Sequence, residues 1–122
     1  MVSGSEDGSL NMGVFFSLKH EDEDFVGENN FGIAYSSFFD FRQAFAEAQG
    51  VENYPTIATY RDPQNVIEQF LWLPDYTGEI EPALCRDLLG PMREFAKEED
   101  IARCFVDLFQ EAVERNLSVE LT

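Results

Sequence analysis

The sequence predicts a single α+β domain in which three helices pack on one face of a mainly antiparallel sheet of about four to five strands. Short apolar segments alternate in the manner of strands, and longer segments repeat apolar residues at helical spacing. The composition is 44% hydrophobic and 14% aromatic, which is too apolar for a disordered acidic chain. The expected order is strand, strand, helix, strand, strand, helix, helix, strand.

Two apolar segments near the N-terminus predict an antiparallel pair of strands. Residues 13–18 (GVFFSL) favour a largely buried strand, and alternate residues of 31–35 (FGIAY) share one face. The charged run 19–24 (KHEDED) between them cannot lie in a core, so it predicts a solvated loop. Residues 1–11 show no periodicity and predict a disordered tail, which leaves 12–122 as the domain.

A helix over about 38–49 is predicted next. Ser36 and Ser37 are suited to cap its N-terminus, because a hydroxyl can accept a hydrogen bond from a free backbone amide. Phenylalanines recur along it at the spacing of one buried stripe. Gly50 is a suitable residue to end it.

The middle of the chain predicts two more extended segments. Residues 56–60 follow the Tyr54–Pro55 pair and favour a third strand. Residues 66–73 (VIEQFLWL) favour a fourth strand, with a short helix as the alternative. The run 74–78 (PDYTG) is typical of a turn or a longer loop.

The C-terminal third predicts two helices and a last strand. One helix starts at Pro82 and runs through Phe95, and we expect Pro91 to kink or split it because proline lacks the amide donor. Residues 98–115 carry one continuous apolar face and predict the second helix, with Asn116 as a left-handed cap. The alternation in 117–121 predicts the strand.

Cys85 and Cys104 both fall within helical patterns, and we expect both thiols to be buried and reduced. No export signal precedes the domain, so a cytoplasmic location is expected rather than a disulfide-forming one. No apolar run approaches the roughly 18–20 residues of a membrane span. We therefore expect no membrane partner.

The charge balance is strongly acidic, with 24 Asp and Glu against 8 Lys and Arg and a formal net charge of −16. Nucleic-acid affinity comes mostly from cationic side chains, so we expect no nucleic-acid partner. The charge attracts basic proteins or cations instead. It also disfavours self-association at low salt, although an apolar patch could overcome this, so the sequence leaves the oligomeric state open.

The first acidic cluster is Glu21, Asp22, Glu23 and Asp24, directly after His20. A solvated loop, a protein-contact loop and a cation site are the three interpretations of it. Calcium loops alternate ligands with spacers, and this contiguous run does not match that pattern.

The second acidic cluster comprises Asp75, Tyr76, Glu79 and Glu81. One interpretation is a turn that leads into the following helix, and the other is a contact surface. We predict that both clusters bind a partner: their seven carboxylates would pair with its Lys and Arg, and Tyr76 would be the apolar anchor.

The common enzyme motifs, including the P-loop, CxxC and HExxH, do not occur in the sequence. We accordingly assign no catalytic or metal-ligating residue and expect no cofactor. An enzyme built on two facing carboxylates and a non-catalytic adaptor domain stay open as alternatives.

Five short segments carry a resemblance to a known family: Met12–Phe16, Tyr35–Arg42, Tyr54–Pro55, Gly78–Pro82 and Ala112–Asn116. They resemble the bacterial immunity proteins of polymorphic toxin systems, in the group called immunity protein 70. That resemblance implies a cytoplasmic, non-catalytic protein that binds and neutralises a cognate toxin with a basic surface, such as a nuclease. An acidic nucleic-acid mimic of phage origin is the alternative inhibitor class.

Overall fold

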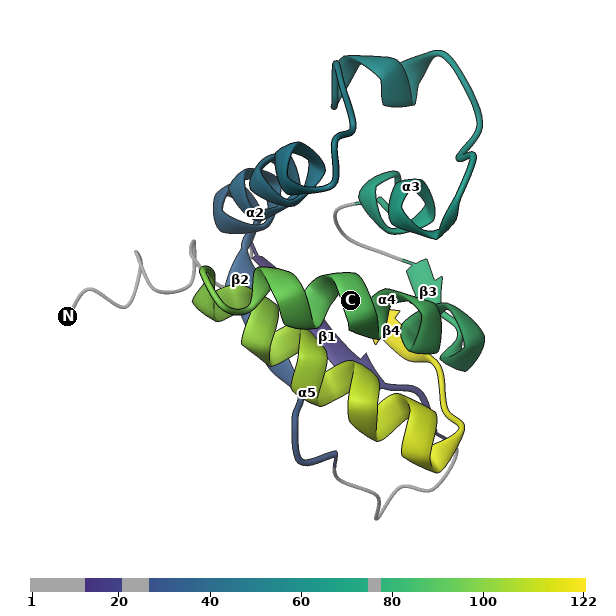
Figure 1. The fold of residues 1–122 in the computed structure, drawn as a ribbon. Coiled ribbons are helices and arrows are strands. Elements are labelled where there is room, and N and C mark those ends of the chain that lie inside the picture. Colours follow the sequence, from purple (N-terminus) through teal and green to yellow (C-terminus); the bar gives the residue numbers. More distant parts are fainter. Residues whose placement is uncertain (1–12, 21–26, 75–77) are drawn as a thin grey trace, which may run out of the picture.

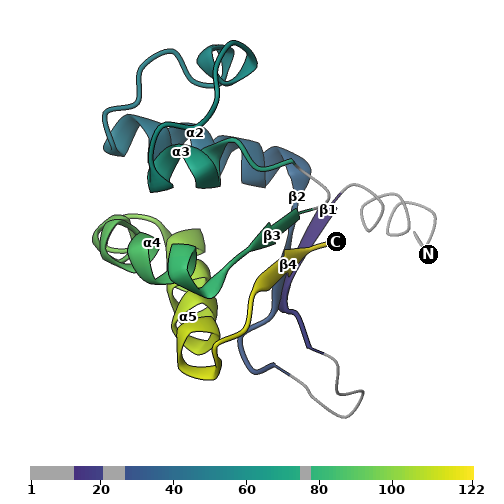
Figure 2. The same ribbon diagram turned by 90° about the vertical axis from the view of Figure 1, so that its right-hand side faces the viewer.

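The computed structural model describes residues 13–20, 27–74 and 78–122, and it confirms the α+β class. A four-stranded antiparallel sheet carries the helices on one side (Figures 1 and 2). The predicted tail, residues 1–11, lies outside the described residues. The elements are β1 (Gly13–Leu18), β2 (Phe31–Ala34), α2 (Tyr35–Ala48), the 3₁₀ turn η1 (Thr56–Thr59), α3 (Val66–Leu71), β3 (Gly78–Ile80), α4 (Pro82–Phe95), α5 (Asp100–Arg115) and β4 (Val119–Leu121).

The strand order is β2-β1-β4-β3, so the first and last strands of the chain pair at the centre of the sheet. Ser17 lies opposite Glu120, and Glu120 lies opposite Glu79 on the next strand. On the other side of β1, Phe15 lies opposite Gly32. Because side chains alternate along a strand, these residues all belong to one face of the sheet.

The opposite face of the sheet meets the helices in a core made largely of phenylalanine rings. Phe105 of α5 is fully buried and lies at the centre of this cluster. Several of its contacts are edge-to-face, an arrangement that aromatic pairs favour. Its ring centroid lies 4.9 Å from Phe16, 5.0 Å from Phe31, 5.1 Å from Phe41, 5.4 Å from Phe70 and 5.5 Å from Phe109.

The first predicted strand is correct in extent but not in burial. Val14 and Phe16 are buried, whereas Phe15 keeps 46% of its surface exposed, because a strand with one covered face buries only alternate residues. The predicted caps are also wrong. Helix α2 begins at Tyr35, directly after β2, and its N-cap Ala34 makes no side-chain hydrogen bond.

The two strands predicted for the middle of the chain are wrong. Residues 56–60 contain the 3₁₀ turn η1, in which the Tyr60 amide donates to the Ile57 carbonyl. Residues 66–73 contain helix α3, the alternative raised above. Asn65 starts α3 by accepting a hydrogen bond from the Glu68 amide at 2.9 Å, which is a side-chain cap that the strand interpretation overlooked.

Two expectations at α4 need correction, namely the turn just before it and the split at Pro91. Residues 78–80 form β3 instead of a loop, because they pair with β4 along its outer side. Helix α4 is one helix from Pro82 to Phe95, so Pro91 does not split it.

Helix α5 and its end follow the prediction, except at one thiol. Cys104 is exposed, while Ala102 and Phe105 occupy the buried stripe. The stripe on this helix is therefore narrower than the apolar pattern suggested. Asn116 does adopt the predicted left-handed conformation, with φ of 55°. Both cysteines are free thiols, as expected.

Candidate functional site

The face of the sheet that lies away from the helices is the candidate site, and we call it the uncovered face. Phe15 and Ser17 of β1 and the following Lys19 lie on this face, as do Gly32 and Ala34 of β2. Strand β3 contributes Glu79, and β4 contributes Glu120, which is followed on the same face by Thr122. Figure 2 shows α4 and α5 on the other side of the sheet, and no helix of the described residues crosses this one. As far as residues 13–20, 27–74 and 78–122 are concerned, the uncovered face is thus open to a partner.

One half of the uncovered face is apolar. The Phe15 ring lies over Gly32, where an added Cβ atom would come within 3.2 Å of its Cδ1 atom. Because Gly32 has no side chain, the Phe15 ring can lie over the backbone of β2 at this position. A shallow cavity of about 510 Å³ lies here and is lined by the residues of β1 and β2 around this pair, together with Thr122.

The other half is acidic, and we call Glu79 and Glu120 the acidic row. They lie directly opposite each other on β3 and β4, a placement of like charges that destabilises a sheet. Lys19 Nζ lies 2.9 Å from Glu79 Oε2, and both side chains are about half exposed, at 54% and 43%. The hydrogen bond from Lys19 holds the pKa of Glu79 below its ordinary value, although partial desolvation opposes this. The Glu79 carboxylate therefore carries charge at neutral pH.

Of the eight residues predicted to bind a partner, the structure describes two. Glu79 lies in the acidic row, and Glu81 is the exposed N-cap residue of α4. The Lys19–Glu79 ion pair joins the residue after β1 to the second acidic cluster, across 60 positions of sequence. Outside the described residues lie Glu21, Asp22, Glu23, Asp24, Asp75 and Tyr76.

Sequence reasoning did not select Phe15 or Glu120. The predicted alternation of 117–121 already separated Glu120 from the apolar residues, so its outward orientation was available from the pattern. Its position opposite Glu79 could not be predicted from the pattern, because pairing between strands far apart in sequence leaves no local signal.

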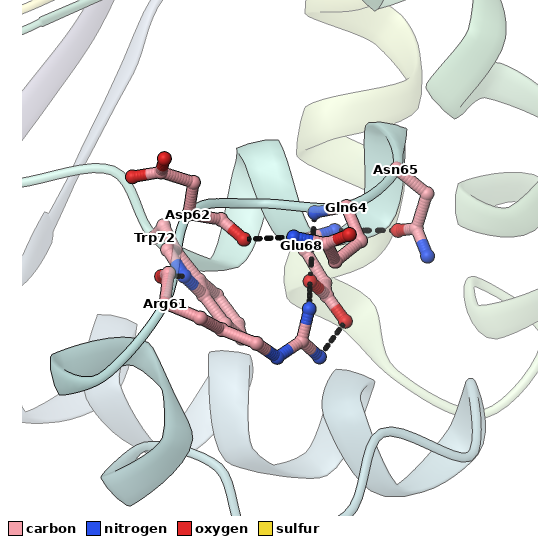
Figure 3. Close-up of polar contacts among 6 residues, drawn as sticks. All are labelled: Arg61, Asp62, Gln64, Asn65, Glu68 and Trp72. Atoms are coloured by element: carbon pink, nitrogen blue, oxygen red, sulfur yellow. Dashed lines mark hydrogen bonds and ion pairs between the residues drawn. The ribbon is translucent and has the colours of Figure 1, made fainter.

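A second polar cluster braces the loop between η1 and α3 (Figure 3). Arg61 donates two hydrogen bonds to Glu68, at 2.8 and 2.7 Å, and these bonds lower the pKa of the Glu68 carboxyl against the opposing effect of desolvation. The Gln64 amide and the Asn65 cap complete the cluster, and Trp72 Nε1 donates to the Arg61 carbonyl at 3.0 Å. Since these groups bond to one another, we assign the cluster a structural role.

The end of α3 is held by side chains in the same way. Arg42 Nη1 donates to the Leu73 carbonyl at 2.7 Å, and the Tyr54 hydroxyl donates to the Leu71 carbonyl at 3.0 Å. These are carbonyls near a helix C-terminus, where partners within the helix run out. The bonds attach α3 firmly to α2 and to the loop before it.

Glu111 on α5 is a third acidic site, and it is buried. Its carboxylate accepts hydrogen bonds from the amides of Glu28 and Asn29, from the Asn29 side chain and from Arg115 Nε. Burial alone would raise the pKa of Glu111, but these four donors together hold it below its ordinary value of 4.5. The carboxylate anchors the turn that leads into β2.

The thiols and the remaining acids offer no further reactive arrangement in the described part of the chain. Burial raises the pKa of the Cys85 thiol to about 12, so this group stays protonated. Among residues 13–20, 27–74 and 78–122, no three His, Cys, Asp or Glu side chains are placed to hold a metal ion. None of the helices described here has the length and apolar character needed to cross a bilayer.

Comparison of the chain with protein-family models, with curated proteins and with solved structures found no match. The resemblance to immunity proteins therefore stays a prediction, and the functional argument depends on the uncovered face itself.

Proposed function

We propose that this chain is an immunity-type inhibitor that binds and neutralises a basic protein toxin through the uncovered face of its sheet. The observation that carries the proposal is the acidic row, in which Glu79 and Glu120 oppose each other on an accessible surface beside the exposed Phe15. Like charges in this position do not stabilise a sheet, and the single cation of Lys19 balances only one of the two carboxylates. The acidic row therefore keeps a net negative charge, and binding to a cation is the use that the arrangement supports best.

The two halves of the face suit different steps of binding. Carboxylates on a chain with a net charge of −16 attract a cationic surface and speed its approach, by electrostatic steering that salt weakens. Phe15 supplies a ring that a partner can desolvate, which slows dissociation once contact is made. The expected partner surface therefore places an apolar side chain next to Lys or Arg.

The test uses the product of the gene next to the one that encodes this chain, as a toxin domain with its active site inactivated. The double variant Glu79→Gln, Glu120→Gln removes the acidic row, and Asp87→Asn, Glu98→Gln removes two exposed acids elsewhere as a charge-matched control. We expect the first to slow association at least about tenfold at low salt and the control to slow it less than about threefold. The Phe15→Ser variant should mainly speed dissociation.

Growth provides the cellular readout. The wild-type chain should relieve the growth arrest caused by the active neighbour, and the acidic-row variant should relieve it less well than the control. A neighbouring product that neither arrests growth nor binds the chain would contradict the proposed function. Equal association rates for the acidic-row variant and the control would contradict the proposed site.

A further inference from the structure

The two edge strands of the sheet differ in how well they are protected against pairing with a strand of another molecule. The β3 edge is three residues long and carries Glu79 at its centre. The β2 edge consists of Phe31, Gly32, Ile33 and Ala34, none of which carries a charge. Natural sheets usually block an edge with charge, proline or a covering element, because free backbone groups there can pair with another strand. Among the described residues, the β2 edge shows none of these devices.

The hydrogen-bond pattern identifies which groups of β2 are free. Phe15 exchanges both backbone hydrogen bonds with Thr122, at 3.0 Å each, so its amide and carbonyl point toward β4. Backbone groups alternate in direction along an antiparallel strand, and Val14 and Phe16 therefore bond to β2. It follows that Phe31 and Ile33, which lie opposite them, point toward β1.

Gly32 and Ala34 consequently direct their amides away from the sheet, and both residues are exposed. The carbonyl of Gly32 points outward as well. By the same alternation, so does the carbonyl of Asn30, just before β2. Four polar groups thus follow one another along a free edge.

This edge lies in an uncharged part of a highly charged molecule. From Asn29 to Phe39 the sequence contains no Asp, Glu, Lys or Arg, although such residues make up 26% of the chain. Two exposed phenylalanines lie on the elements next to β2: Phe15, 46% exposed, on the strand paired with it, and Phe39, 39% exposed, on the helix that follows it. A cationic partner finds no carboxylate within this stretch.

We infer that the β2 edge pairs with the β2 edge of a second copy of this chain, so that two sheets continue into one across a two-fold axis. In an antiparallel pairing centred on Gly32, the two Gly32 residues exchange two hydrogen bonds, and each Ala34 amide donates to the Asn30 carbonyl of the other copy. The uncharged edge is where two copies of charge −16 repel each other least, and charge depletion is typical of interface cores.

The dependence on salt separates this contact from toxin binding. Two acidic copies repel each other, and salt screens this repulsion, so salt should strengthen the dimer. Binding of a cationic partner by the acidic row should weaken with salt instead. The acidic row lies on β3 and β4, whereas the outward amides of Gly32 and Ala34 lie at the β2 edge, so a variant of either set leaves the residues of the other set unchanged.

The test is light scattering after size exclusion on the full chain, from about 10 µM to about 1 mM and from about 0.05 M to about 0.5 M salt. We expect the mass to rise from the 13.9 kDa monomer toward twice that value with concentration and with salt. The Ala34→Pro variant removes an outward amide, and the φ of −65° at Ala34 is the angle that proline requires. We expect it to weaken dimerisation at least about tenfold, while Ala34→Ser, which keeps the amide, leaves it unchanged.

Amide hydrogen exchange tests the same contact without any substitution. The Gly32 and Ala34 amides should become protected as the concentration rises, while the Glu79 amide on the other edge exchanges at the same rate throughout. A wild-type chain that stays monomeric at about 1 mM in about 0.5 M salt would overturn the inference. So would a dimer in which these two amides stay unprotected, or one that a folded Ala34→Pro variant forms equally well.

Discussion

The two faces of the sheet use the same kinds of residue for opposite purposes. Phe15 and Phe16 are neighbours on β1, yet Phe16 is fully buried against the helices and Phe15 is 46% exposed on the uncovered face. The ring of Phe16 contacts Phe105 and Phe38, and it belongs to the core. Adjacent positions of one strand thus divide the molecule into a half that folds and a half that is free to bind.

The acids divide in the same manner. Glu111, on a helix of the covered side, is buried and accepts hydrogen bonds from four donors. Glu120, on the uncovered face, lies opposite another carboxylate. An acid whose donors are supplied by the fold stabilises the fold, whereas an acid set against a like charge is suited to a ligand from outside.

The largest expected effect tests the division between the rings. Phe105→Ala removes the ring at the centre of the core, and we expect it to lower the free energy of unfolding by about 3–5 kcal/mol. Phe15→Ala should lower it by less than about 1 kcal/mol, since the side chain keeps much of its surface in water in the folded state. Urea unfolding of both variants measures the two values.

The comparison between the two rings fails if both substitutions lower the free energy of unfolding by similar amounts. A loss of about 3 kcal/mol for Phe15→Ala would mean that this ring is buried in solution. Phe15→Leu is the matched control for shape, and it should leave the free energy of unfolding nearly unchanged.

The covered side was largely predictable from the sequence, because a helix with one buried face repeats apolar residues at a regular spacing. The apolar stripe of 98–115 predicted α5, and Asn116 and Gly50 were correctly identified as helix ends, with φ of 55° and 73°. Segment 66–73 was misassigned because six helical residues are too few to show a period, and its decisive signal is the Asn65 cap.

The candidate site was less predictable, because it depends on strand pairing. Glu79 was selected for its acidic neighbours, while Glu120, its partner across the sheet, lies 41 positions further along and has no local feature that marks it. Strand β3 itself was taken for part of a turn, since three residues, one of them a glycine, carry too little pattern. Long-range pairing is the information that local reasoning lacks.

The next prediction tests the buried acid through pH. The pKa of Glu111 lies below its ordinary value of 4.5 in the folded chain, so the carboxylate stabilises the fold above that pH and this contribution is lost as the pH falls through the folded-state pKa. We expect Glu111→Gln to lower the free energy of unfolding by about 1–2 kcal/mol at neutral pH. The difference from the wild type should shrink below about pH 4.

Urea unfolding between neutral and acidic pH measures this difference. Glu114→Gln, on the same helix but exposed, is the matched control and should change the pH dependence little. A difference between wild type and Glu111→Gln that stayed constant down to about pH 3 would show that charge at this position does not stabilise the fold.

The smallest expected effect is also the sharpest test of the uncovered face, because stability and binding should change in opposite directions. Glu120→Lys turns the opposed carboxylates into a pair of opposite charges, and we expect a rise in Tm of roughly 1–3 °C. The same substitution should weaken binding of the basic partner more than Glu120→Gln does, since it repels the cation instead of merely failing to attract it. Thermal unfolding and association rates of the two variants provide both readouts. A lower Tm for Glu120→Lys would mean that Glu120 is already satisfied within the fold, and the acidic row would then be as structural as Glu111.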